Sequence, residues 1–205
     1  MRVPRLLAIS DPGAAPGPQW QRWCEALGAA GIDGLQVRQK ACTDRDLLAL
    51  AAAARDASPR PRTLLVNARP DIARAARADG VQLPASGLPV AAVRRAFGTT
   101  LLIGRSTHSV DEVWQARAQG ADFVIFGPVF ETPSKAGWIP ARGISALSVA
   151  VTCGLPVLAI GGIDQHNAQS IVDSGAWGVA AIRWFQDPAA GQPAFAALLR
   201  SWGES

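Results

Sequence analysis

The chain has 205 residues, of which 49% are hydrophobic and 18% are charged, and its formal net charge is +4. This composition is typical of a globular domain with a sizeable core and excludes a disordered tail. No apolar run approaches the roughly 20 residues that a membrane helix needs. The first apolar run, residues 6–9, is too short for a secretory signal. We therefore expect a cytoplasmic protein without a membrane partner.

The placement of the basic residues, cysteines and histidines excludes two further classes of function. The arginines are dispersed over helix-like stretches, no basic run is interleaved with aromatic residues, and tyrosine is absent. We therefore expect no nucleic-acid partner. The three cysteines are odd in number and lack the spacing of metal ligands, and two histidines accompany them. We expect reduced thiols and no metal site.

Eight short apolar runs, separated by helix-like stretches, follow one another along the chain. Runs of this kind are typical of parallel strands that helices cover on both faces. In chain order, the predicted strands are residues 6–10, 34–38, 63–67, 80–84, 101–106, 123–126, 156–161 and 178–182.

Helix starts are recognisable between several of these runs. Thr43 stands before an Asp-rich first turn, Pro70 suits a first helical position, and Ser109 with Glu112 forms a capping box. Asp164 is the predicted N-cap of a helix through residue 174. Eight strand–helix units predict one domain, a single (β/α)8 TIM barrel over residues 1–205. A doubly wound sheet is the alternative, but no Gly-x-Gly-x-x-Gly follows the first strand.

Polar residues interrupt the apolar runs mainly at the carboxyl ends of the predicted strands. In a barrel of this type the active site lies in the loops after the strands, so these residues are candidates for binding a substrate. The positive charges among them favour an anionic substrate. The substrate-binding candidates are Gln36, Arg38, Lys40, Asn67, Ser106, Thr132, Ser134 and Lys135.

Two further features of the predicted rim indicate chemistry. His108 directly precedes the predicted N-cap Ser109, and the positive end of a helix dipole favours a neutral imidazole that is able to take up a proton. A histidine that only hydrogen-bonds a loop is the alternative. The segments after the last two strands predict a phosphate cradle, because backbone N–H groups gather there in many such barrels. The cradle residues are Gly161, Gly162, Ile182 and Arg183.

The residues at the rim resemble the superfamily of thiamine-phosphate synthases and thiazole tautomerases (TenI-type), over nearly the whole chain. The motifs that carry the resemblance are residues 35–40, 66–73, 103–109, 120–130 and 159–163. The resemblance implies a small phosphorylated heterocyclic substrate, a thiazole phosphate in particular, and a place in thiamine biosynthesis.

The positions at which this chain departs from the family pattern indicate which of the family's two branches it resembles more. The resemblance implies that synthases hold magnesium with two aspartates, at positions where this chain has Ala68 and Gly87. Neither residue is able to ligate magnesium, which requires oxygen ligands. The tautomerase branch is more similar in residues 81–84, 104–106 and 130–132, and its acid–base histidine corresponds to His108. The implied activity is a metal-independent isomerase without a cofactor, which aromatises a carboxythiazole phosphate by a proton shift.

Several alternatives stay open at this point. A thiamine-phosphate synthase without its usual magnesium ligands is one, and a barrel acting on another heterocyclic phosphate is a second. A non-catalytic regulatory barrel that binds a thiamine-type phosphate is the third, because Arg183 and Trp184 stand where the family has small residues. The sequence leaves two explanations open for Trp20, Trp23 and Trp202: a homodimer contact, or ordinary packing of helices.

Overall fold

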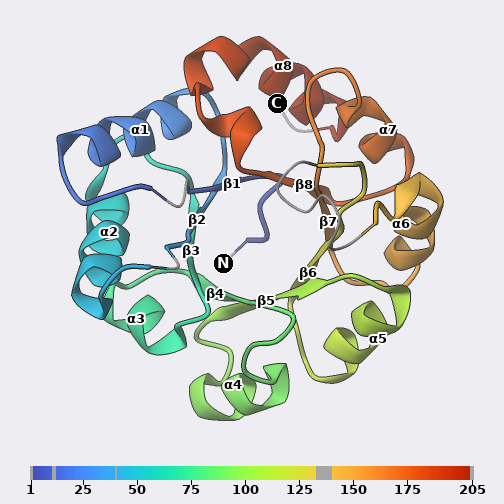
Figure 1. Cartoon of the computed structure of the whole chain (residues 1–205), viewed down its shortest axis with the longest axis horizontal. Coiled ribbons are helices and arrows are strands. Elements are labelled where there is room, and N and C mark those ends of the chain that lie inside the picture. The colour runs from blue at the N-terminus through green and yellow to red at the C-terminus, as the bar shows by residue number, and fades with distance from the viewer. Residues whose placement is uncertain (1, 11–12, 40, 133–139, 204–205) are drawn as a thin grey trace.

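The computed structural model describes residues 2–10, 13–39, 41–132 and 140–203. It confirms the predicted fold: eight parallel strands form a closed barrel in sequence order, and the helices surround it (Figure 1). The strands are β1 (Leu6–Ile9), β2 (Gly34–Val37), β3 (Thr63–Asn67), β4 (Gly80–Leu83), β5 (Leu102–Thr107), β6 (Phe123–Phe126), β7 (Val157–Ile160) and β8 (Gly178–Ala181).

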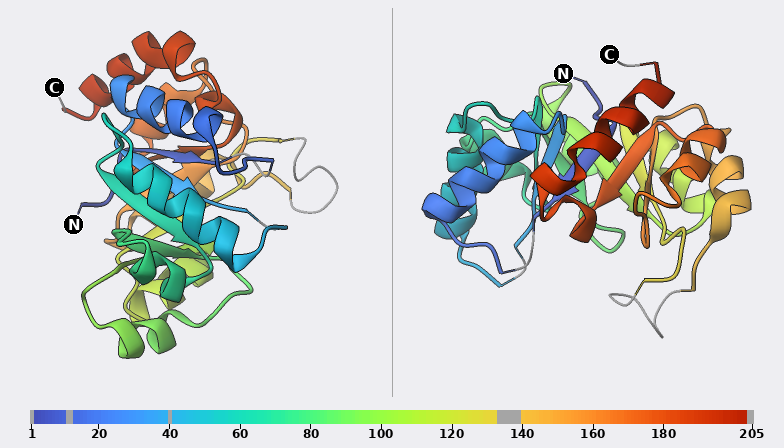
Figure 2. Two further views of the ribbon diagram at one scale, coloured as in Figure 1. Left: turned by 90° about the vertical axis from the view of Figure 1, so that its left-hand side faces the viewer. Right: turned by 90° about the horizontal axis from the view of Figure 1, so that it is seen from above.

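Helices follow the strands and pack on the outside of the barrel. The ring closes where α8 lies beside α1 (Figure 2). The helices are α1 (Pro18–Ala29), α2 (Asp44–Asp56), α3 (Pro70–Ala75), α4 (Val90–Phe97), α5 (Val110–Ala118), α6 (Gly143–Val151), α7 (Ala168–Asp173) and α8 (Pro188–Ser201). Within the described residues, no helix is both long enough and apolar enough to span a membrane.

The strands are apolar along both faces because each face packs against a separate core. The larger core lies between the barrel and the helices and includes Leu35, Val66 and Phe126. The smaller core fills the inside of the barrel with residues from alternate strand positions, among them Leu7 and Phe123. Burial on both faces explains why the strands appear in the sequence as continuous apolar runs.

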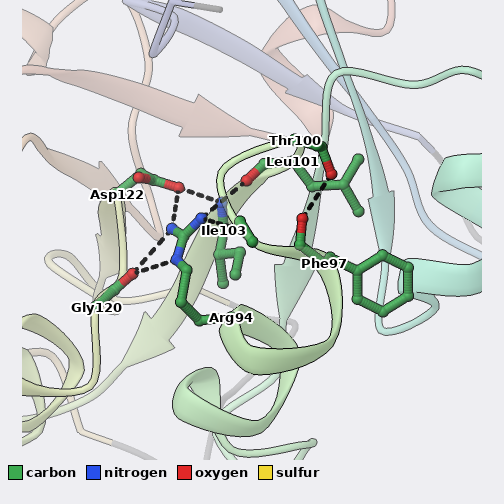
Figure 3. Close-up of polar contacts among 8 residues, drawn as sticks. Arg94, Phe97, Thr100, Leu101, Ile103, Gly120 and Asp122 are labelled. Atoms are coloured by element: carbon green, nitrogen blue, oxygen red, sulfur yellow. Dashed lines mark hydrogen bonds and ion pairs between the residues drawn. The ribbon is translucent and has the colours of Figure 1, made fainter.

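An aspartate before each of three even-numbered strands closes the amino-terminal end of the barrel. Its carboxylate accepts a hydrogen bond from a backbone N–H of the preceding strand. The pairs are Asp33 with Leu6 (2.7 Å), Asp79 with Leu64 (2.8 Å) and Asp122 with Ile103 (2.7 Å). Asp122 also binds Arg94 of α4 (2.7 Å), as Figure 3 shows. The equivalent residue before β8 is Trp177, whose carbonyl accepts a hydrogen bond from the Arg5 side chain (2.6 Å).

Two of the expected helix caps are present. The Thr43 hydroxyl accepts the Asp46 N–H (3.2 Å) and the Ser109 hydroxyl accepts the Glu112 N–H (3.2 Å). The prediction for Asp164 was wrong, since α7 begins at Ala168 and its N-cap is Asn167. The Asp164 carboxylate instead accepts the N–H of His166 (2.8 Å), which closes a turn before the helix.

Trp20, Trp23 and Trp202, for which the sequence leaves a dimer contact open, each donate a hydrogen bond within the chain. Trp20 is buried and donates to the Leu50 carbonyl (2.9 Å). Trp23 donates to the Phe185 carbonyl (3.1 Å), and Trp202 donates to the Ala176 carbonyl (3.0 Å). These contacts favour helix packing as the explanation for all three side chains.

Candidate active site

Four polar side chains project into the barrel at the carboxyl ends of β2 to β5. Gln36 of β2 and Gln82 of β4 are almost completely buried, with 2% and 1% of their surface exposed. Asn67 ends β3, and the Gln82 side-chain amide donates to the Ser106 hydroxyl (3.0 Å). Gly104 leaves room for this amide, because a Cβ there would stand 2.1 Å from the Gln82 Oε1. The sequence predicted Gln36, Asn67 and Ser106 here, and the structure brings them to the same mouth.

Two of these buried amide groups have polar atoms without a partner. Within the described residues, neither the Gln36 Nε2 nor the Gln82 Oε1 makes a hydrogen bond. A buried polar group without a partner is rare and costs free energy. The mouth of the barrel therefore offers one donor and one acceptor to a polar ligand or to water.

His108 follows β5 and is held from two sides. Its backbone N–H donates to the Glu112 carboxylate (2.6 Å), and its ring Nδ1 lies 2.5 Å from the Gly127 carbonyl oxygen. A carbonyl oxygen only accepts hydrogen bonds, so Nδ1 carries the proton. In the neutral ring, Nε2 then has a free lone pair and is able to accept a proton.

The capping box of α5 contributes directly to this geometry. In the usual arrangement, the carboxylate at the third helical position returns to the N–H of the cap residue itself. Here Glu112 reaches one residue further and binds the N–H of His108, while Ser109 still accepts the Glu112 N–H. The start of α5 therefore fixes the backbone of the candidate acid–base residue.

Arg38 follows β2 and brings positive charge to the rim. It is half-buried, and burial lowers the pKa of its guanidinium. Ser10, which follows β1, fixes the backbone of Arg38: its hydroxyl accepts the Arg38 N–H (2.8 Å) and donates to the Arg38 carbonyl (3.1 Å). A partly desolvated cation at this position favours an anionic group on a ligand.

The two glycines after β7 pack closely against the segment that follows β6. The Gly161 carbonyl accepts the Phe130 N–H (3.0 Å), and the Gly162 carbonyl accepts the Asn167 side-chain amide (2.8 Å). Both glycines have positive φ, 101° and 65°, and a Cβ at Gly162 would stand 2.4 Å from the Glu131 carbonyl oxygen. In a trans peptide the N–H points opposite to the carbonyl. The N–H of Gly162 therefore points away from Phe130.

Arg183 begins a short 3₁₀ helix directly after Ile182, which follows β8. Its Nη2 lies 3.5 Å from the Thr132 hydroxyl, so it joins segments on either side of β7. Trp184 packs away from this contact, with ring centroids 5.5 Å from Phe185 and 5.3 Å from Phe195. Arg183 is exposed, which leaves its guanidinium accessible to an anion.

Lys40, Ser134 and Lys135, which the sequence predicted as binding residues, lie outside the described residues. The segment 131–142, which follows β6, is described only at residues 131–132 and 140–142.

The residues at the positions of the implied magnesium site do not fit that metal. Ala68 and Gly87 offer no side-chain oxygen. Asp71, the carboxylate nearest in sequence to Ala68, is engaged, since it binds Arg69 (2.6 Å), which also binds Asp44. Among the described residues, no three His, Cys, Asp or Glu side chains cluster as metal ligands do.

Sequence reasoning gave Gln82 and Arg105 no role in the site, and it gave Glu112 a role in helix capping alone. Gln82 had one detectable signal, a polar side chain inside an otherwise apolar strand. Arg105 donates hydrogen bonds to the Ala85 and Leu88 carbonyls, which precede α4. No sequence pattern predicts such long-range contacts.

Comparisons with known proteins agree with the fold. The family model described as thiamine monophosphate synthase matches residues 6–185. A putative thiamine-phosphate synthase of Geobacter sulfurreducens is 42% identical over 179 residues, covering 86% of this chain and 84% of that protein. A thiamine-phosphate synthase of Chlorobium luteolum is 40% identical over 181 residues, covering 87% and 84%. The solved thiamine phosphate pyrophosphorylase of Pyrococcus furiosus superposes with a TM-score of 0.83 at 28% identity, covering 96% of this chain and 95% of that one.

Proposed function

The chain belongs to the thiamine monophosphate synthase family, and from this premise we propose that it is an enzyme of thiamine biosynthesis that moves a proton on a phosphorylated thiazole. The names of its relatives favour a different reaction, the synthase reaction, so the proposal depends on the residues of this chain. The residues that support it lie at the mouth of the barrel: His108, the arginines of the rim, and two glycines with positive φ.

The contact between His108 and Gly127 carries the proposal. Because the Gly127 carbonyl accepts the Nδ1 proton, the Nε2 lone pair is free to act as a general base. Nε2 takes a proton from a saturated ring carbon of the thiazole, and the C–H electron pair enters the ring as it becomes aromatic. The imidazolium then returns a proton to another atom of the same substrate. Substrate and product are isomers, so the step needs no oxidant, metal or leaving group.

The remaining residues of the mouth are suited to hold the substrate in place. Arg183 is exposed beside Thr132, and the Gly162 N–H points away from Phe130, so both are proposed to bind the phosphate. Arg38 is proposed to bind the ring carboxylate. The free Gln36 Nε2 and Gln82 Oε1 are proposed to bind the polar edge of the heterocycle.

The two histidines of the chain provide a matched test. His108→Gln removes the proposed base but keeps a side chain able to hydrogen-bond Gly127, whereas His166→Gln changes an exposed residue in the turn before α7. We expect turnover of the unaromatised carboxythiazole phosphate to fall at least about 100-fold in the first variant. Its affinity for the product and the activity of His166→Gln should stay near the wild-type values. Equal turnover in the two variants would exclude His108 as the base.

Thiamine-phosphate synthase is the second candidate, and the names of the relatives favour it over the tautomerase. Such a synthase would join a pyrimidine pyrophosphate to the thiazole phosphate and release pyrophosphate. Ala68 and Gly87 count against a magnesium-dependent form of that reaction, because they leave the metal without its two carboxylates. A synthase predicts pyrophosphate release that rises with added magnesium and stops with a chelator.

A further inference from the structure

Arg105 points out of the barrel between two residues that point in. It lies on β5 between Gly104 and Ser106, and its register partner is Leu83 of β4. Successive side chains of a strand alternate between faces, so Arg105 reaches the layer between α4 and α5. It is half-buried there, and burial lowers the pKa of its guanidinium. A charge withdrawn from water in this way needs hydrogen bonds to offset the cost.

The guanidinium finds those bonds on the segment that joins β4 to α4, residues 84–89. Its Nη2 donates to the Ala85 carbonyl (2.6 Å) and its Nη1 donates to the Leu88 carbonyl (3.0 Å). The two carbonyls stand three residues apart, so one planar group fixes both halves of the segment. The segment directly follows Gln82 and Leu83, at the rim of the mouth.

The end of the segment is held by α4, since the Pro89 carbonyl accepts the Ala92 and Val93 N–H groups, but the described residues give the rest of it few other hydrogen bonds. Two of its six residues, Pro84 and Pro89, have no backbone N–H to donate. The Gly87 N–H bonds within the segment, to the Pro84 carbonyl (2.8 Å), and Leu88 is 52% exposed. On the side of α5 lies a hollow of about 180 Å³ instead of packed side chains. Its lining includes Ala85 of the segment, Arg105 of β5, and Glu112, Gln115 and Ala116 of α5.

We propose that Arg105 is a positioning residue, whose two hydrogen bonds hold residues 84–89 against β5 and so fix the rim beside Gln82 and Ser106. Arg105 acts through this segment and does not touch the substrate. Without the two bonds, the segment is free to move into the hollow or away from the mouth. The wall of the binding site then loses its fixed position, which weakens binding more than it slows the proton transfer at His108.

The test compares Arg105→Met, Arg105→Lys and, as a control on the exposed face of α4, Arg95→Met. The first readout is hydrogen exchange of the Gly87 amide, which reports opening of the segment. Loss of two hydrogen bonds should speed this exchange at least about tenfold in Arg105→Met. Arg105→Lys should recover part of the protection, and Arg95→Met should match wild type. The second readout, which rests on the proposed function, is the KM for the thiazole phosphate, expected to rise about tenfold with kcat within about threefold.

Two results would overturn the proposal. Unchanged Gly87 exchange in Arg105→Met would show that the bonds do not hold the segment. Faster exchange with wild-type KM and kcat would show that the segment's position does not matter to the site. The exchange readout is independent of the reaction. If the chain turns over no thiazole phosphate, the proposed function is refuted. Hydrogen exchange of the Gly87 amide still decides whether Arg105 holds the segment.

Discussion

The direction in which a side chain leaves its strand decides its role in this protein. Ser106 and Arg105 are neighbours on β5, yet Ser106 bonds Gln82 inside the mouth and Arg105 bonds two carbonyls on the outer side. Placement at the rim was predictable from the sequence, because polar residues end apolar strands there. The partners were not, since Ala85 and Leu88 lie 20 and 17 residues away from Arg105 and depend on the path of the intervening segment.

His108 shows the same division between what the sequence does and does not determine. Its place before the N-cap Ser109 was predictable from the capping box. Its tautomer was not, because the Nδ1 proton is fixed by the carbonyl of Gly127, at the end of another strand. The side chain of Glu112 also departs from the usual pattern by one residue, a difference that only the three-dimensional path of the turn determines.

The three thiols differ in burial and should differ in reactivity. Burial raises the pKa of Cys24 to about 12, and Cys153 is also buried, whereas Cys42 is partly exposed. The pKa of Cys42 is raised as well, by partial burial and by the nearby Asp46 carboxylate. The thiolate is the reactive form. At pH 8 we therefore expect slow alkylation at Cys42, faster as the pH rises, and none at Cys24 or Cys153 until the chain unfolds.

Mass spectrometry of tryptic peptides after timed iodoacetamide treatment measures this order directly. The unfolded chain in urea is the control, because all three thiols are then equally accessible. Alkylation of Cys24 in the folded chain as fast as that of Cys42 would contradict the burial described here.

At the scale of elements, the strand starts depend on charged groups from neighbouring units. The aspartates before β2, β4 and β6 recur at equivalent places, and this repeat was visible in the sequence only as isolated acidic residues. Arg94 adds a link between units. It donates to the carbonyls of Gly120 and Leu101 and to the carboxylate of Asp122 (Figure 3). It also donates to the Gly98 carbonyl.

Neighbouring arginines on α4 make this link testable. Arg94→Ala removes hydrogen bonds to the ends of α4 and α5 and leaves Asp122 without its cation. We expect its free energy of unfolding to fall by roughly 1–3 kcal/mol. Arg95→Ala, on the exposed face of the same helix, should change it by less than about 0.5 kcal/mol. Urea denaturation of both variants measures the difference, and equal losses would refute the structural role given to Arg94.

At the scale of the whole molecule, eight apolar runs sufficed to predict the barrel, because alternating strands and helices leave few other ways to bury both strand faces. Element ends were less predictable. The start of α7 was placed too early, since Asp164 forms a turn with His166 before the helix begins at Ala168. The fold by itself leaves the reaction open, because barrels of this type support many chemistries.

The reaction is decided most directly by assaying wild-type chain for both activities in parallel, with chelator and with added magnesium. One assay follows formation of the aromatic thiazole phosphate from its unaromatised isomer, and the other follows pyrophosphate release from a pyrimidine pyrophosphate and the thiazole phosphate. Proton transfer by His108 predicts chelator-insensitive aromatisation and no pyrophosphate release under either condition. Magnesium-dependent pyrophosphate release without aromatisation would contradict the account and establish a synthase. Binding of the thiazole phosphate without either reaction would contradict it too, and would leave a ligand-binding barrel.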